Sequence, residues 1–162
     1  MSAKVSVIVP VYNPGPKLKS NLASLDRLLE EVPNSEIIFV DDCSTDGSFE
    51  DLGNWCEDRE AARLVKLESN SGSPSQPRNV GIEKALGEYV YFLDADDRIL
   101  PSGINASVGI ADRSGADFVR APLIRDDGHE QVVMNEINGW ERLSASERKQ
   151  AVVRFQSTTA PA

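Results

Sequence analysis

Cysteine and histidine are scarce in this chain, which has two cysteines and one histidine among its 162 residues. Cys43 and Cys56 are too few for a disulfide framework, and a site in which Cys and His side chains alone hold a metal would normally need more of them. We interpret both cysteines as free thiols in a reducing compartment. His129 lies in a polar stretch, and we assign it no role.

Long apolar runs are also missing. No apolar run approaches the roughly 20 residues that a membrane-spanning helix needs. The first predicted strand begins almost at the N-terminus, which leaves no room for a signal peptide. We therefore expect a cytoplasmic protein without a membrane span, which as part of a longer protein could lie peripherally at a membrane.

Positive charge is in deficit, because 17 Lys and Arg residues face 26 Asp and Glu residues and give a formal net charge of -9. A chain without excess cations does not neutralise nucleic-acid phosphates, so non-specific nucleic-acid binding is excluded. The length suits one domain with a real core, and a hydrophobic content of 40% is ordinary for a globular protein.

The most informative segment is an apolar run that ends in closely spaced carboxylates, Tyr91-Phe92-Leu93-Asp94-Ala95-Asp96-Asp97. The apolar residues predict a buried strand, and the acids follow where open α/β sheets bind ligands. Neighbouring carboxylates raise one another's pKa unless a cation offsets their charge. Mg²⁺ or Mn²⁺ suits oxygen ligands and usually holds substrate phosphates too. The pattern indicates a metal bridge to a diphosphate, although Asp-x-Asp alone is better explained as an acidic turn.

Strands and helices alternate in the prediction, which implies a mostly parallel sheet with right-handed crossovers. Strands are expected at 5–11, 36–40, 64–67, 89–93 and 116–121, with a short edge strand at 131–135. Helices are expected at 16–31, at 48–62 with Ser48 as its cap, from the cap Ser75 to Leu86, from Pro101, and from the capping box 144–147 to about Arg154. Pro10 should end the first strand and Gly87 the third helix.

Three further blocks accompany the acidic one. They read Lys4-Val5-Ser6-Val7-Ile8-Val9-Pro10-Val11-Tyr12-Asn13, then Asp41-Asp42-Cys43-Ser44-Thr45-Asp46-Gly47-Ser48 after a strand, and Asn70-Ser71-Gly72-Ser73-Pro74-Ser75-Gln76-Pro77-Arg78-Asn79-Val80-Gly81. In this order and spacing the blocks resemble the nucleotide-binding half of family 2 glycosyltransferases of the GT-A fold, over about residues 4–124. The third block looks most like the branch that glycosylates the polyol phosphates of wall teichoic acid.

The resemblance implies the fold and its division. It predicts an α/β, Rossmann-like GT-A fold, a mostly parallel sheet with helices on both faces, truncated at its C-terminal side. Residues 1–124 would form the nucleotide-sugar-binding core. Residues 125–162 would be the incomplete start of the acceptor-side region.

The resemblance also assigns the nucleotide base to the ends of the first two strands. Pro10 and Tyr12 would cradle the base, although Tyr12 taken alone is more often a half-buried core aromatic. Asp41, the first acid of its pair, would accept the N3–H of uracil. Capping the following loop through backbone hydrogen bonds fits Asp42 better than Asp41.

The resemblance assigns the contacts to the diphosphate and the metal to the later sequence blocks. Asn70 and Arg78 would contact the nucleotide, with a weak surface salt bridge as the alternative for Arg78. Asp96 would coordinate Mn²⁺ or Mg²⁺ directly. Asp94 would bind the ribose, the metal or a metal-bound water, and Asp97 would support them.

We therefore expect a metal-dependent glycosyltransferase domain that binds a nucleotide diphosphate sugar, with UDP as the expected nucleotide. The acceptor would be a glycan or a polyol-phosphate polymer. The branch resembled is inverting, but the carboxylate base is expected to be absent from this chain, because Glu136, Glu141 and Glu147 are weakly placed. A nucleotide-binding module without activity and, less favoured, a nucleotidyltransferase are the alternatives. Apolar surface left uncovered could also favour a homo-oligomer.

Overall fold

A computed structural model describes residues 3–120, 123–126 and 131–134. The chain divides into two compact units, Met1–Ala106 and Ser107–Ala162. The boundary between the units falls within the residues of helix α4 (Pro101–Ser114). No helix within these described residues is long and apolar enough to cross a membrane.

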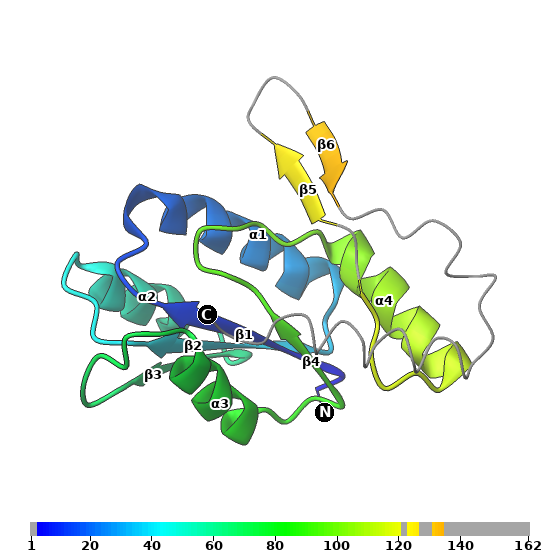
Figure 1. Ribbon diagram of the computed structural model, residues 1–162, viewed down its shortest axis with the longest axis horizontal. Coiled ribbons are helices and arrows are strands. Elements are labelled where there is room, and N and C mark those ends of the chain that lie inside the picture. The colour runs from blue at the N-terminus through cyan, green and yellow to red at the C-terminus, as the bar shows by residue number, and fades with distance from the viewer. Residues whose placement is uncertain (1–2, 121–122, 127–130, 135–162) are drawn as a thin grey trace, which may run out of the picture. The chain divides into compact units, whose positions relative to one another are not determined.

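The first unit is built on a four-stranded parallel sheet with the order β3-β2-β1-β4. Its strands are β1 (Val5–Val11), β2 (Ser35–Asp41), β3 (Ala62–Lys66) and β4 (Tyr89–Phe92). The connections pass through the short 3-10 helix η1 (Gly15–Lys17) and the helices α1 (Leu18–Glu31), α2 (Ser48–Glu57) and α3 (Ser75–Lys84). Figure 1 shows α1 and α3 on opposite sides of the sheet. The expected α/β fold with helices on both faces is therefore confirmed.

The strand order reverses at β1. The chain steps outward from β1 to β2 and β3, and then returns to place β4 on the free side of β1. Crevices at such reversals, outside the carboxyl ends of the strands, are where open α/β sheets bind ligands. The sequence's polar blocks follow these strand ends, so the topology brings them together.

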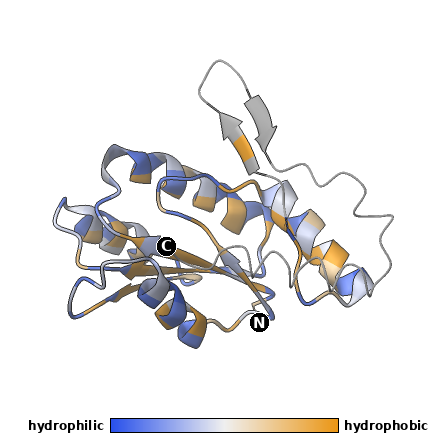
Figure 2. Cartoon of the chain, in the orientation of Figure 1, coloured by the Kyte–Doolittle hydropathy of each residue, from blue (hydrophilic) through white to orange (hydrophobic). Residues whose placement is uncertain are grey.

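The core consists of the two central strands and the inner face of α1. Ile8, Phe39 and Leu28 have no exposed surface, and the apolar residues gather along these strands in Figure 2. Strands buried on both faces read as continuous apolar runs, which explains why β1 and β2 were predicted closely. The helical leucines are core residues, as expected.

Pro10 does not end the first strand, which continues to Val11. Even-numbered residues of β1 bond towards β4, since the carbonyls of Lys4 and Ile8 accept from Tyr89 and Leu93. Pro10 faces the same side, where β4 has already ended at Phe92. Its missing N–H therefore costs the sheet no hydrogen bond, which is the condition under which proline is tolerated in a strand.

Two helix caps also differ from expectation. Gly47, with a φ of 89°, precedes α2, and the Ser48 N–H is bound by the Asp46 carboxylate at 3.0 Å. Helix α2 ends at Glu57 because β3 already begins at Ala62. Helix α3 follows Pro74 without a side-chain cap, so Ser75 does not cap it.

Two glycines allow close packing in the first unit. A Cβ on Gly81 would lie 2.3 Å from Ile8 Cγ2, so only glycine lets α3 approach β1 this closely. Helix α3 ends at Lys84, before Gly87, whose own Cβ would lie 2.6 Å from the Ser6 nitrogen. The expected role of Gly87 as a helix terminator was wrong, because its position is set by this contact with β1.

In the second unit the strand expected at 116–121 is displaced. Residues 116–120 are irregular, and β5 (Leu123–Asp126) pairs with β6 (Gln131–Met134) in antiparallel register. A short strand forms where a neighbour can bond its backbone, and β6 supplies that neighbour to residues 123–126. The edge strand expected at 131–135 is confirmed. His129, the three glutamates considered as bases and the helix expected at 144–154 lie outside the described residues.

Candidate functional site

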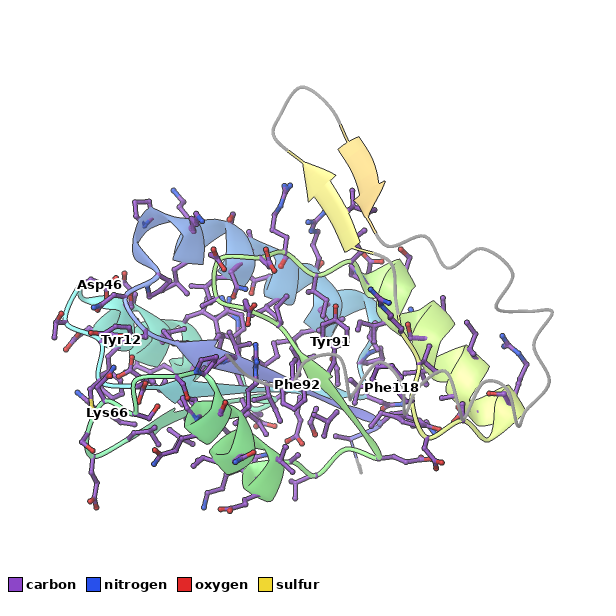
Figure 3. All side chains as sticks on the ribbon, viewed as in Figure 1. Tyr12, Asp46, Lys66, Tyr91, Phe92 and Phe118 are labelled. Atoms are coloured by element: carbon purple, nitrogen blue, oxygen red, sulfur yellow. The ribbon has the colours of Figure 1, made fainter. Side chains whose placement is uncertain are left out.

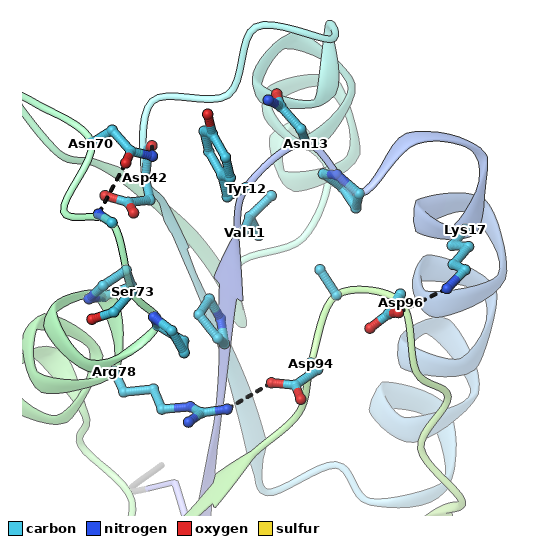
Figure 4. A pocket seen from close by; sticks show the side chains of 16 residues that line it. Val11, Tyr12, Asn13, Lys17, Asp42, Asn70, Ser73, Arg78, Asp94 and Asp96 are labelled. Atoms are coloured by element: carbon cyan, nitrogen blue, oxygen red, sulfur yellow. Dashed lines mark hydrogen bonds and ion pairs between the residues drawn. The ribbon is translucent and has the colours of Figure 1, made fainter. Parts of the chain in front are cut away.

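A pocket of about 580 Å³ opens at the carboxyl ends of β1 and β4, within the first unit (Figure 4). This volume lies in the range of small-molecule sites. The lining residues come from all four sequence blocks, and they are Pro10, Val11, Tyr12, Asn13, Pro14, Lys17, Asp42, Asn70, Gly72, Ser73, Pro74, Pro77, Arg78, Asp94, Ala95 and Asp96. Six of the seven residues expected to contact nucleotide or metal are among them, and Asp41 is not.

Tyr12 offers an aromatic ring to the pocket. Its exposed fraction is 56%, so it is not the half-buried core aromatic that the residue taken alone would suggest. The next residue, Asn13, fixes the turn, because its N–H donates to Ser44 Oγ and its Oδ1 accepts the Thr45 N–H at 2.8 Å. Asp46, at the same end of the molecule as Tyr12 in Figure 3, accepts the Gly15 N–H at 2.9 Å. The loop is therefore held while the ring stays open to a ligand.

Asp41, the last residue of β2, and Asp42, which follows it, lie in different surroundings. Asp41 has no exposed surface, and its two carboxylate oxygens accept the Ser44 N–H at 3.3 and 3.1 Å. Asp42 lines the pocket instead. The loop-capping role expected for Asp42 thus belongs to Asp41.

Asp42 also anchors the serine-rich loop. Its carboxylate accepts the Ser71 N–H and the Ser71 hydroxyl, both at 2.8 Å. Asn70 donates from Nδ2 to the Asp42 carbonyl at 2.9 Å and accepts the Gly72 N–H at 2.9 Å. Gly72 has a φ of 74°, which favours glycine there. Asn70 therefore shapes this wall of the pocket through its own side chain.

Arg78 reaches across the pocket from the first turn of α3. Its guanidinium donates to Asp94 Oδ1 at 2.7 Å and lies 5.7 Å from the centroid of the Phe92 ring. Its Nε is buried without a hydrogen-bond partner among the described residues. Together, Arg78 and Asp94 place a fixed cation beside the acids, in a fork geometry that suits phosphate.

The acids Asp94–Asp97 form a turn, called here the acidic turn, in which the Asp97 N–H donates to the Asp94 carbonyl at 3.0 Å. Lys17 donates to Asp96 Oδ2 at 2.9 Å, and its ammonium holds the pKa of Asp96 below the ordinary value. Burial raises the pKa of Asp97, and the charges of Asp96 and Asp94 raise it further. Two cations therefore offset the crowded negative charge.

Comparison with known proteins now decides the family. The family model of glycosyl transferase family 2 matches residues 6–159 of this chain. This chain belongs to glycosyl transferase family 2. The family assignment confirms the resemblance seen in the sequence blocks.

Relatives with assigned activities are much longer than the matched region. The poly(ribitol-phosphate) beta-N-acetylglucosaminyltransferase TarS of Staphylococcus aureus is 35% identical over 118 residues, which cover 72% of this chain and 20% of TarS. The poly(ribitol-phosphate) beta-glucosyltransferase of Bacillus spizizenii is 40% identical over 96 residues, which cover 59% of this chain and 15% of that protein. The chain thus spans about a fifth or less of the length of these family 2 relatives.

Solved family 2 structures share the fold. Residues 1–349 of S. aureus TarS in complex with UDP-GlcNAc match with a TM-score of 0.62 and 35% identity, over 70% of this chain and 32% of that one. The mannosyltransferase PcManGT from Pyrobaculum calidifontis, in complex with GDP-Man and Mn²⁺, matches with a TM-score of 0.59 and 29% identity, over 68% of this chain and 33% of that one.

The residues of this family 2 site fit a metal ion only when a bound substrate supplies further oxygen ligands. Asp94 and Asp96 provide hard oxygen donors, but no group of three or more Asp, Glu, His or Cys residues in the described part of the chain could hold a metal ion. Mg²⁺ is commonly bound by one or two carboxylates together with waters and substrate phosphates. The donor set therefore suits a divalent ion that a diphosphate helps to hold.

Sequence reasoning missed three contributors to this site. Lys17 lies in the pocket because the turn Pro14-Gly15-Pro16 carries it there, and the helical pattern gave no hint of this. Asn21 donates from its buried side chain to the acidic turn, and its place on the inner face of α1 was the only available signal. Gly81 was read as part of a motif, although its role is the close contact with Ile8.

Proposed function

We propose that this chain forms the donor site of a family 2 glycosyltransferase, which binds a nucleotide diphosphate sugar for transfer to a hydroxyl acceptor. The observation that carries the proposal is the composition of one pocket. The exposed ring of Tyr12 and the buried acid Asp42 lie on one side of it. Two ion pairs, Lys17–Asp96 and Arg78–Asp94, lie on the other side. These are the groups needed for a base and for a metal-bound diphosphate.

UDP is the nucleotide that this pocket would favour. Asp42, rather than Asp41, is the acceptor proposed for the uracil N3–H, because it is the acid of the pair that lines the pocket. Tyr12 would stack on the base, and Pro10 and Asn70 would bound it. The complex of the related TarS with UDP-GlcNAc supports UDP, and the sugar itself would be chosen elsewhere in the site.

Mn²⁺ or Mg²⁺ is proposed at Asp96, with Asp94 assisting. A bound divalent ion would act as a Lewis acid that stabilises the negative charge of the leaving diphosphate. Arg78 would hold and orient the diphosphate, because its planar guanidinium matches phosphate geometry. The Mn²⁺ present in the related mannosyltransferase structure supports this assignment.

A polyol phosphate is the acceptor class that the relatives suggest, since two of them are named poly(ribitol-phosphate) transferases. Family 2 enzymes of this branch invert, and an inverting reaction needs a carboxylate that takes the acceptor's proton. We assign no residue to that role. The comparisons do not favour the alternative of a module that holds nucleotide without transfer.

A thermal-shift panel tests the proposal. UDP, GDP, CDP and dTDP would each be added with and without Mn²⁺ to the wild type and to Asp96→Asn. We expect UDP with Mn²⁺ to give the largest shift, corresponding to about 2.7 kcal/mol at a concentration ~100 times the dissociation constant. Asp96→Asn should lose the Mn²⁺-dependent part. No stabilisation by any nucleotide would refute the donor site.

A further inference from the structure

Lys17 occupies an unusual position in the pocket. It is the last residue of η1, directly after Pro14-Gly15-Pro16, and it lines the same cavity as Arg78. Its ammonium lies 2.9 Å from Asp96 Oδ2, on the side of the acidic turn opposite Arg78 (Figure 4). The carboxylate proposed to coordinate the metal therefore already has a cation from the protein itself.

The backbone, and not the ion pair, fixes this geometry. Asn21, one helical turn after Lys17, has no exposed surface and donates to the carbonyl oxygens of Asp94 at 3.2 Å and Asp97 at 2.9 Å. Ser24 Oγ accepts the Ile99 N–H at 3.1 Å. Helix α1 thus clamps both ends of the acidic turn. These contacts do not involve the Lys17–Asp96 ion pair, so they hold the acidic turn near Lys17 by themselves.

A divalent ion at Asp96 competes with this ammonium for the carboxylate, because two cations at one carboxylate repel each other. The displaced ammonium then needs another anionic partner. The diphosphate of a nucleotide brings one into the pocket beside Asp96. A lysine ammonium has three donors on a flexible stem, so it can move from one acceptor to the other without a change of backbone.

We propose that Lys17 is a diphosphate-binding residue that competes with the metal for Asp96 until the nucleotide arrives. The inference rests on the proposed function, because it requires a nucleoside diphosphate in this pocket. Its consequence is cooperativity: the metal binds weakly alone, the nucleotide releases Asp96 by accepting Lys17, and each ligand strengthens the binding of the other by the same factor.

Lys17→Met tests this proposal, with Lys19→Met as the matched control. Lys19 is exposed in the first turn of α1, two residues after Lys17, and is absent from the pocket, so the control removes the same charge. Mn²⁺ binding without nucleotide would be measured by electron paramagnetic resonance, and UDP binding at saturating Mn²⁺ by calorimetry. We expect Lys17→Met to bind Mn²⁺ alone about two- to fivefold more tightly. It should bind UDP roughly tenfold more weakly.

The background variant Asp96→Asn provides a second test. There Lys17→Met should no longer tighten Mn²⁺ binding, because the contested carboxylate is gone. If Lys17→Met matches Lys19→Met in both measurements, the inference is overturned while the donor site stands. If wild-type chain binds no UDP at all, the donor site is refuted and this inference with it.

Discussion

Gly81→Ala should destabilise the protein, although alanine is the better helix former. The new Cβ would lie 2.3 Å from Ile8 Cγ2, inside a core where Ile8 has no exposed surface. Overpacking of this kind typically costs about 1–3 kcal/mol. The gain in helix propensity offsets about 1 kcal/mol of that. The expected net loss in the free energy of unfolding is therefore up to about 2 kcal/mol.

The same substitution at Gly53 is the control. Gly53 lies inside α2, and a Cβ there would meet nothing within 4 Å. Gly53→Ala should therefore raise stability by up to about 1 kcal/mol. Urea denaturation of both variants beside the wild type measures the difference. If Gly81→Ala proves as stable as Gly53→Ala, the close approach of α3 to β1, which carries Arg78 to the pocket, is not as described.

Two further predictions concern Asp42 and Glu36. Asp42→Ala should weaken UDP relative to GDP by about 1–3 kcal/mol, as measured by calorimetry, whereas Asp41→Ala should lower the melting temperature without changing that preference. Equal loss of both nucleotides in Asp42→Ala would contradict the assignment. Burial raises the pKa of Glu36, but hydrogen bonds from Ser6 and Leu86 and the charge of Arg63 outweigh it and hold the pKa below 4.5. The stability that Glu36 adds is therefore present above pH 4.5 and lost as the pH falls through its lowered pKa. The difference in unfolding free energy between wild type and Glu36→Gln should shrink on acidification, and a difference constant with pH would count against it.

The central strands β1 and β2 and the place of the pocket were predictable because their signals are local. Continuous apolar runs identified β1 and β2, and the polar residues after each strand end had to meet at the reversal of strand order. The orientation of Asp41 and Asp42 was not predictable. Residues of β2 are buried on both faces, so no alternation of polarity shows which acid faces the pocket. The resemblance to a family pointed to this pair of acids, and of the two only Asp42 lines the pocket.

Contacts between distant segments were the other gap. Lys17 and Asp96, which form an ion pair, are 79 positions apart in the sequence. The residues next to either of them in the sequence do not indicate this pairing. The prediction that Pro10 ends the first strand was wrong for a related reason. A proline destabilises a strand only where a neighbouring strand lies on the side that its nitrogen faces. Contacts of this kind depend on the three-dimensional arrangement of the sheet and its helices, and a short stretch of sequence does not determine them.

The most direct test of the central claim is a crystal structure of this chain grown with UDP and Mn²⁺. The account predicts the uracil ring against Tyr12 with its N3–H directed at Asp42, and the diphosphate between Arg78 and the acidic turn with Mn²⁺ at Asp96. Nucleotide bound outside this pocket, or bound in it with the base at the acidic turn and the phosphates beside Tyr12, would contradict the account.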